Sequence, residues 1–257
     1  LLSRRQRQMC IRDSFKDFMK YAFKNVEGMT LDVGSYVLIP KISKKSTRLP
    51  FDDEDLKKLF NAETYPSRYK EKSFAKFWIP VIALYSGARV NEISQLKVED
   101  IIKFDGVYCF YFTDEGDGQS LKNESSKRIV PIHSELIKLG FLDFVDDVKK
   151  KKKDRVFYTL NRTEHSNYGD TISKWFGVYR RKVGIVSKNK TLHSMRHNVE
   201  TKLVNNNISE TIQNSICGWS DKGVGQRVYA KKEIKTLQSA IETIKYEFWD
   251  DVVDNLK

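Results

Sequence analysis

The stretch that decides the fold is Ala83–Leu96, which reads ALYSGARVNEISQL. It follows a strongly apolar segment, residues 73–85, that predicts a buried helix, and Pro80 predicts a kink or a break within that helix. Gly87 ends the helix, and Arg89 begins a short second one. An arginine at this place offers a bidentate fork to phosphate oxygens, beside backbone N–H groups of the new helix.

Glu92 lies three residues after Arg89 and is placed to orient its guanidinium from behind. The alternative is an ordinary Arg–Glu surface pair on one helical face. Taken alone, the segment leaves both interpretations open.

A second stretch, residues 191–203, reads TLHSMRHNVETKL and predicts a helix capped by Thr191. His193 and Arg196 are three residues apart, so both project from one helical face toward a common ligand. His197 lies on another face, where we expect it to pack or to bond internally. The alternative is that this pair is a chance occurrence of two common residue types.

A third stretch, residues 216–231, reads ICGWSDKGVGQRVYAK. Gly218 ends a helix, Trp219 follows, and Tyr229 comes ten residues later. A tyrosine hydroxyl has a pKa of about 10 and is a poor nucleophile unless neighbouring groups activate it. Without such neighbours, a lone Trp or Tyr is more often a core anchor with one hydrogen-bonding tip.

The remaining pattern predicts an α+β fold that is mainly α, with one small antiparallel β-sheet packed on a helical core. Strands are expected where β-branched and aromatic residues alternate, at Ile101–Phe104, Val107–Phe112 and Arg128–Ile132. Further helices are expected over about Ser134–Lys149, Gly169–Val183, Leu192–Asn206, Ile208–Cys217 and Glu233–Phe248.

The three stretches together resemble the catalytic domain of the tyrosine recombinases, the phage-integrase family. The resemblance covers roughly residues 45–246, and three motifs carry it in order: G-x-R-x-x-E from Gly87, H-x-x-R-H from His193, and G-W-S followed by Tyr229. Joint order and spacing make the match specific, although each motif alone is weak or moderate. One departure is Trp219, at a position where most members carry His.

The family also has a catalytic lysine in a β-hairpin between the two arginine motifs. The hairpin here reads SLKNESSKRIVPI, and the typical T-K-x-x-x-S-x-R-x-V-P-L run places that lysine at Lys122. Lys127, in the same loop, is the alternative. The resemblance thus implies a catalytic set of six residues, supported by Glu92: Arg89, Lys122, His193, Arg196, Trp219 and Tyr229.

The chemistry that the resemblance implies is transfer of a phosphodiester to an enzyme tyrosine. Tyr229 attacks phosphorus and forms a 3′-phosphotyrosine, Lys122 protonates the departing 5′-oxygen, and His193 is the partner for the tyrosine proton. Trp219 has an indole N–H that donates but cannot move a proton, so its role is to bind the transition state. The resemblance implies no metal and no cofactor.

The charge balance favours a polyanionic partner, since 46 Lys and Arg face 34 Asp and Glu for a formal net charge of +12. A generic lysine-rich surface is the alternative. The three cysteines are scattered and predict neither a disulfide framework nor a zinc site, which fits a cytoplasmic protein. With the resemblance, the expected partners are double-stranded DNA and three further copies in a homotetramer on two duplexes. No membrane is expected, and the host is a prokaryote or its phage or mobile element.

Three regions are expected along the chain. Residues 1–14 have no clear amphipathic period and resemble translated adapter sequence, so we expect a non-native or artefactual N-terminus. Residues 15–49 are expected to be the remnant of an N-terminal DNA-binding domain plus a linker, in a chain truncated before Leu1. Residues 50–257 are expected to form the catalytic domain, and the helix after Glu233 is a candidate for docking on a neighbouring subunit.

Two rival functions use the same residues. A type IB topoisomerase would nick and reseal DNA with this constellation, but the spacing from G-W-S to Tyr229 and the hairpin fit recombinases better. A DNA-binding protein that kept the fold and lost activity would be favoured by a missing Arg or Tyr, and the set of six is complete. The DNA target sequence, and integration as against excision, resolution or inversion, are not encoded in these motifs.

Overall fold

The computed structural model describes residues 4–28, 48–219 and 230–249. The chain divides into two compact units, Leu1–Thr47 and Arg48–Lys257. The first contains α1 (Arg4–Asn25), a continuous helix that begins well before Phe15, where the amphipathic pattern starts. Side chains on its apolar face, such as Phe15 and Phe18, are exposed. The origin of residues 1–14 stays a prediction.

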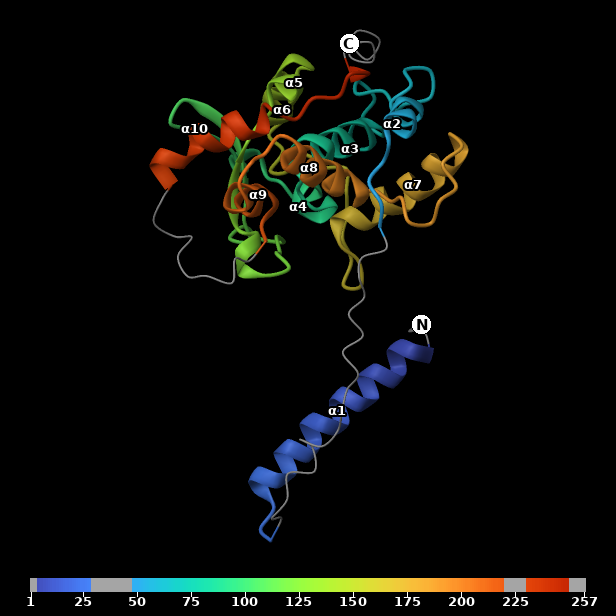
Figure 1. Ribbon diagram of the computed structural model, residues 1–257, viewed down its shortest axis with the longest axis vertical. Helices are drawn as coiled ribbons and strands as arrows, with labels where there is room; N and C mark the ends of the chain where they lie inside the picture. The colour runs from blue at the N-terminus through green and yellow to red at the C-terminus, as the bar shows by residue number, and fades with distance from the viewer. Residues whose placement is uncertain (1–3, 29–47, 220–229, 250–257) are drawn as a thin grey trace. The chain divides into compact units, whose positions relative to one another are not determined.

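The second unit holds the other elements (Figure 1). In chain order they are α2 (Asp53–Leu59), α3 (Phe74–Ser86), α4 (Val90–Ser94), η2 (Val98–Asp100), β1 (Ile101–Phe104), β2 (Val107–Phe112), η3 (Glu124–Ser126), β3 (Arg128–Pro131), α5 (Ser134–Lys138), α6 (Phe141–Lys150), α7 (Tyr168–Lys182), α8 (Ser194–Asn205), α9 (Glu210–Cys217) and α10 (Ala230–Ile241). The predicted mainly α fold with one small sheet is confirmed. Among the described residues, no helix combines the length and apolarity that crossing a bilayer requires.

Helix α3 is the centre of this unit. Every residue of it except Lys76 is buried, and it packs against α4, α5, α7 and α8 (Figure 1). A helix that is apolar on all sides belongs in a core, because no face of it is stable in water. The helix passes through Pro80 without ending, so of the two predicted alternatives the break is wrong and the kink stays a prediction. Gly87 ends it as predicted, in the left-handed conformation at φ 63°.

The sheet is a three-stranded antiparallel meander in the order β1-β2-β3. Asp105 and Gly106, both at positive φ, make the tight turn from β1 to β2, a conformation that suits the twist of a hairpin. Phe112 at the end of β2 pairs with Arg128 at the start of β3. The hairpin between these two residues therefore starts and ends at one edge of the core.

Two predicted helices differ in the structure: one is divided into two, and the other ends early. The segment 134–149 forms α5 and α6, separated at Gly140, which lies at φ 87°. The last helix, α10, ends at Ile241 rather than near Phe248. Beyond it, the apolar residues at 244, 246 and 248 are all buried. Residues two apart do not lie on one face of a helix, so this alternation does not fit a continued helix.

Helix α10 packs on its own chain, against β2, β3 and α9. Ile234, Leu237 and Ile241 are buried on that face. The apolar face of this helix is therefore covered within the chain, and docking of the helix on a neighbouring subunit stays a prediction. The segment after it is also anchored, since the Tyr246 hydroxyl donates to the Leu84 carbonyl at 3.1 Å.

Replacing Gly87 by alanine is expected to destabilise the fold by about 2–3 kcal/mol, from left-handed strain plus crowding. A Cβ there would lie 3.1 Å from Cγ1 of Val199 and 3.3 Å from Sγ of Cys217. Gly184→Ala is the matched control, because its φ of 90° carries the strain but nothing lies within 4 Å. We expect it to cost only about 1 kcal/mol. Urea unfolding of both variants measures the difference, and equal losses would contradict the crowding at Gly87.

Candidate active site

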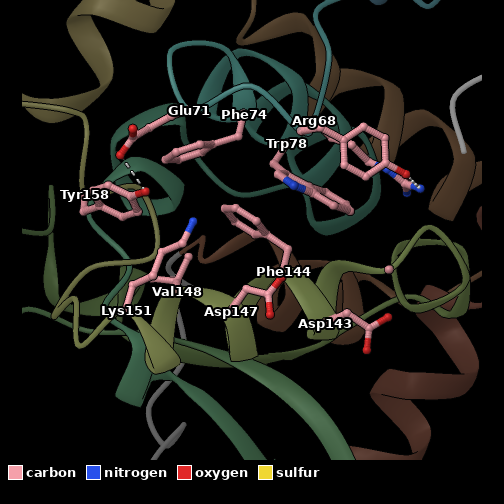
Figure 2. A pocket seen from close by; sticks show the side chains of 12 residues that line it. Arg68, Glu71, Phe74, Trp78, Asp143, Phe144, Asp147, Val148, Lys151 and Tyr158 are labelled. Carbon is pink, nitrogen blue, oxygen red and sulfur yellow. Dashed lines mark hydrogen bonds between the residues drawn. The ribbon is translucent and has the colours of Figure 1, made fainter.

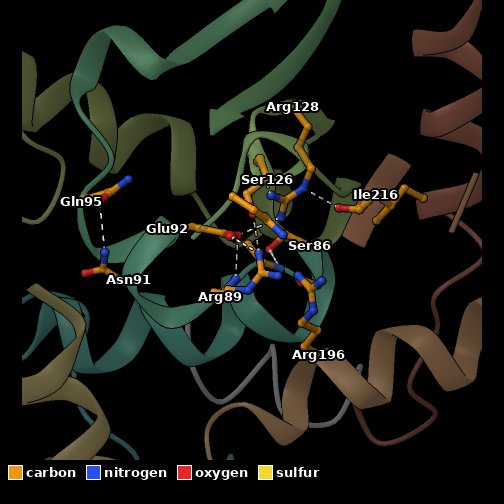
Figure 3. Close-up of polar contacts among 12 residues, drawn as sticks. Ser86, Arg89, Asn91, Glu92, Gln95, Ser126, Arg128, Arg196 and Ile216 are labelled. Atoms are coloured by element: carbon orange, nitrogen blue, oxygen red, sulfur yellow. Dashed lines mark hydrogen bonds and ion pairs between the residues drawn. The ribbon is translucent and has the colours of Figure 1, made fainter. Parts of the chain in front are cut away.

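Arg89 lies at the N-terminus of α4, in extended conformation directly after the end of α3. Its Nη1 donates to Glu92 Oε1 at 2.5 Å and to Ser126 Oγ at 2.9 Å (Figure 3). Its backbone N–H donates to Glu92 Oε2 at 2.9 Å. That N–H is therefore occupied by Glu92, and the expectation that backbone N–H groups of the new helix face an anion stays a prediction. Nη2 and Nε of Arg89 donate to no group among the described residues, which leaves them for a ligand.

Glu92 is buried, and its carboxylate joins two arginines. Besides Arg89, it accepts from Nη2 of Arg128 at 3.0 Å. Burial acts to raise the pKa of Glu92, but the charges of Arg128 and Arg89 outweigh it, and the pKa lies below its usual value. Glu92 is thus ionised at neutral pH, and its buried bond to Arg89 fits the first of the two interpretations that the sequence left open.

Arg128 is a member of the site that the sequence motifs did not single out. It is 9% exposed, and its guanidinium lies against the ring of Phe112 with Cζ 4.6 Å from the centroid. The sequence did contain a motif that could have identified it, because Arg128 is the arginine of the S-x-R-x-V-P run by which Lys122 was aligned. It also shares a strand face with buried Val130.

Arg196 lies in the first turn of α8 and is 3% exposed. Nη1 donates to the Gly87 carbonyl at 2.8 Å, which ties it to the end of α3, while the buried Nη2 has no hydrogen-bond partner within the described ranges. Its Cζ lies 5.2 Å from the ring centroid of Trp219, in cation–π contact. Burial, with repulsion from Arg128 and Arg89, lowers the pKa of Arg196 to about 10.

His193 is half-buried at the N-terminal end of α8. Burial, together with the positive charges of Arg48 and Arg196, lowers its pKa to about 4, so the imidazole is neutral at pH 7. Its ring centroid lies 5.5 Å from that of His197, which bonds to Glu200 within the same helix as expected. Thr191 is not the cap: its backbone N–H donates to Ser194 Oγ, and the helix begins at Ser194.

The two candidate lysines differ in their surroundings. Lys127 pairs with Glu115 across the hairpin. Lys122 is exposed and makes no hydrogen bond or ion pair with any described residue. Tyr229, the predicted nucleophile, lies outside the described residues.

A cavity in the described part of the chain lies elsewhere. It has a volume of about 360 Å³ and is walled by aromatic side chains of Phe74, Trp78, Phe144 and Tyr158 (Figure 2). No predicted site residue lines it. The predicted site residues that the structure describes therefore lie away from this cavity. Among the described residues no cluster of His, Cys, Asp and Glu has the makings of a metal site.

Arg89 and Arg128 bond to the buried carboxylate of Glu92 and Arg196 lies nearby, and this excess of positive charge suits a polyanion. The comparisons agree with that class of protein. The family model described as the phage integrase family matches residues 50–235. The chain belongs to this family, whose members cleave and rejoin DNA through a phosphotyrosine, and it is a site-specific DNA recombinase of this type. No curated protein sequence matches the chain.

Solved structures of the same fold include two lambda integrase complexes. A lambda integrase dimer bound to a COC′ core site is 18% identical with a TM-score of 0.52, covering 94% of this chain and 74% of that one. A lambda integrase tetramer bound to a Holliday junction is 16% identical with a TM-score of 0.53, covering 86% and 61%. The XerH site-specific recombinase in a pre-cleavage complex with difH substrate is 16% identical with a TM-score of 0.54, covering 93% and 62%.

The pKa of His193 has a consequence for stability against pH. Because it lies near 4 in the folded chain and near 6.5 in the unfolded chain, the unfolded chain binds more protons between those values. The stabilising effect of the neutral imidazole is complete above pH 6.5 and is lost as pH falls toward 4. We expect wild type to lose more unfolding free energy than His193→Asn between pH 7 and pH 5. Urea unfolding at both values measures this, and equal losses would exclude a depressed pKa.

Proposed function

We propose that Arg89, His193, Arg196 and Trp219 surround one scissile phosphate of DNA and that Tyr229 attacks it. The observation that carries the proposal is the buried Nη2 of Arg196, which finds no partner among the described residues beside the open Nε and Nη2 of Arg89. A buried guanidinium N–H without an acceptor is costly. A phosphate oxygen supplies the missing acceptor and the missing negative charge.

The arrangement favours the transition state over the ground state. Negative charge on the nonbridging oxygens grows as the pentavalent state forms, and donors already fixed in place bind that charge without reorganising. Arg89 is fixed by Glu92 and Ser126, and Arg196 by the Gly87 carbonyl and the Trp219 ring.

His193 is suited to take the proton of Tyr229. Its depressed pKa leaves it neutral, and a neutral imidazole accepts a proton where an imidazolium cannot. The DNA phosphate adds negative charge beside the ring, which raises the proton affinity of the imidazole when substrate is bound.

Lys122 is the better candidate for the acid that protonates the departing 5′-oxygen. Its exposed ammonium has no partner among the described residues, whereas Lys127 is held by Glu115. Trp219 acts by stacking on Arg196 and by donating its indole N–H, since indole cannot shuttle a proton.

The partners proposed are double-stranded DNA and, in the strand-exchange complex, four copies of the chain on two duplexes. Support comes from the lambda integrase tetramer on a Holliday junction, which shares the fold. We also propose that residues 15–49 belong to a DNA-binding domain and its linker and that the protein acts in the cytoplasm of a prokaryotic host. No metal or cofactor takes part in this scheme.

The proposal is tested by trapping the covalent intermediate. The protein is incubated with a pool of nicked duplex oligonucleotides, randomised around the nick, and adducts are separated on a denaturing gel. We expect wild type to form an adduct, Tyr229→Phe to form none, and EDTA to leave the yield unchanged. An adduct that persists in Tyr229→Phe would exclude this nucleophile.

The two lysines are separated by single-turnover cleavage on a sequence recovered from that pool. We expect Lys122→Ala to lower the rate on the order of 100-fold, because the departing oxygen loses its acid. Lys127→Ala is the matched control from the same hairpin and is expected to keep the wild-type rate. The opposite order of effects would assign the acid to Lys127.

A further inference from the structure

Arg128 is buried and bonds to three different segments of the chain (Figure 3). Nη2 donates to Glu92 in α4 at 3.0 Å, Nε donates to the Ile216 carbonyl in α9 at 2.8 Å, and Nη1 donates to the Ser126 carbonyl in η3 at 2.7 Å. A planar guanidinium with fixed donor directions holds its acceptors in one mutual geometry, which a lysine ammonium does not.

The bond to Ile216 concerns the end of α9. The last carbonyls of a helix have no partner inside the helix, and Arg128 satisfies the one at Ile216. The helix then ends at Gly218, at φ 64°, where a Cβ would lie 2.8 Å from Nη1 of Arg128. The next residue is Trp219, which stacks on Arg196. Arg128 thus sets where the chain leaves α9 and enters the stretch that leads to Tyr229.

The bond from Arg128 to Glu92 acts on Arg89 through the shared carboxylate. Arg128 holds Oε2 of the carboxylate while the side chain of Arg89 holds Oε1, so the carboxylate is fixed from both sides. The bond to the Ser126 carbonyl holds the hairpin, and the hydroxyl of the same residue accepts from Nη1 of Arg89. Four residues before Ser126 in that hairpin is Lys122.

We propose that Arg128 is a positioning residue for the cleavage reaction: it fixes Glu92 behind Arg89, the hairpin that carries Lys122, and the end of α9 before Trp219, without touching the phosphate. The proposal rests on the function proposed above for those residues. It assigns to one buried side chain the relative placement of donors from three segments. Its loss therefore lowers the rate of the chemical step more than the affinity for DNA.

The test compares Arg128→Lys with Arg180→Lys in the same chain. Arg180 is also buried and bonds to the carbonyls of Ile185 and Ser187, but contacts none of the site residues. Thermal unfolding, DNA affinity by mobility shift, and single-turnover cleavage of the nicked duplex are measured for both. We expect Arg128→Lys to cleave about 10- to 100-fold more slowly at saturating DNA, with half-saturation unchanged, and Arg180→Lys to cleave at the wild-type rate.

A double-mutant cycle with Glu92→Gln separates positioning from general stability. If Arg128 acts partly through Glu92, the double variant loses less rate than the two single losses combined. Additive losses, a wild-type rate in Arg128→Lys, or an equal rate loss in Arg180→Lys would overturn the proposal. An adduct that persists in Tyr229→Phe would instead overturn the proposed function, and the two failures are thus distinct.

Should Arg128→Lys not fold, Phe112→Leu takes its place. It removes the ring beneath the guanidinium and leaves every hydrogen-bonding group intact. We expect about a two- to fivefold slower cleavage with unchanged DNA affinity. An unchanged cleavage rate in a folded Phe112→Leu would contradict the proposal.

Discussion

The buried carboxylate of Glu92 is the interaction on which the site depends. It is 3% exposed and lies between Arg89 and Arg128, with Arg196 nearby. Removing one partner of a buried ion pair leaves an unbalanced charge and is strongly destabilising. The two arginines and the acid therefore act as one unit, and the segments that carry them are held at a common point.

The same unit leaves a surplus of positive charge. Two guanidiniums bond to the Glu92 carboxylate and a third lies nearby, and repulsion from Arg128 and Arg89 adds to burial in lowering the pKa of Arg196. An anionic ligand would offset this surplus, which is the physical basis of the phosphate-binding role proposed above for Arg89 and Arg196. The neighbouring His193 feels the same field, which together with burial keeps its imidazole neutral and able to accept a proton.

Secondary structure near the site followed well from the sequence where one physical rule dominated. The strands were predicted within one residue, because alternating β-branched and aromatic residues and an Asp–Gly turn leave little choice. The fully apolar α3 and its end at Gly87 were predicted for similar reasons. The prediction failed where tertiary packing decides: α10 ends at Ile241, and alternating residues after it are buried.

The sequence by itself indicated the family, which the family match confirms, and it predicted the residue types of the site, because motif order and spacing can be read without coordinates. Only the tertiary structure decided how those residues share their partners. Arg128 lies 36 residues from Glu92 and 88 from Ile216 along the chain, and no local sequence pattern predicts that one guanidinium bonds to both. The structure also distinguishes the surroundings of the two candidate lysines, because Glu115 pairs with Lys127 across the hairpin and not with Lys122. Hydrogen bonds between distant segments are set by the packing of the core that brings those segments together.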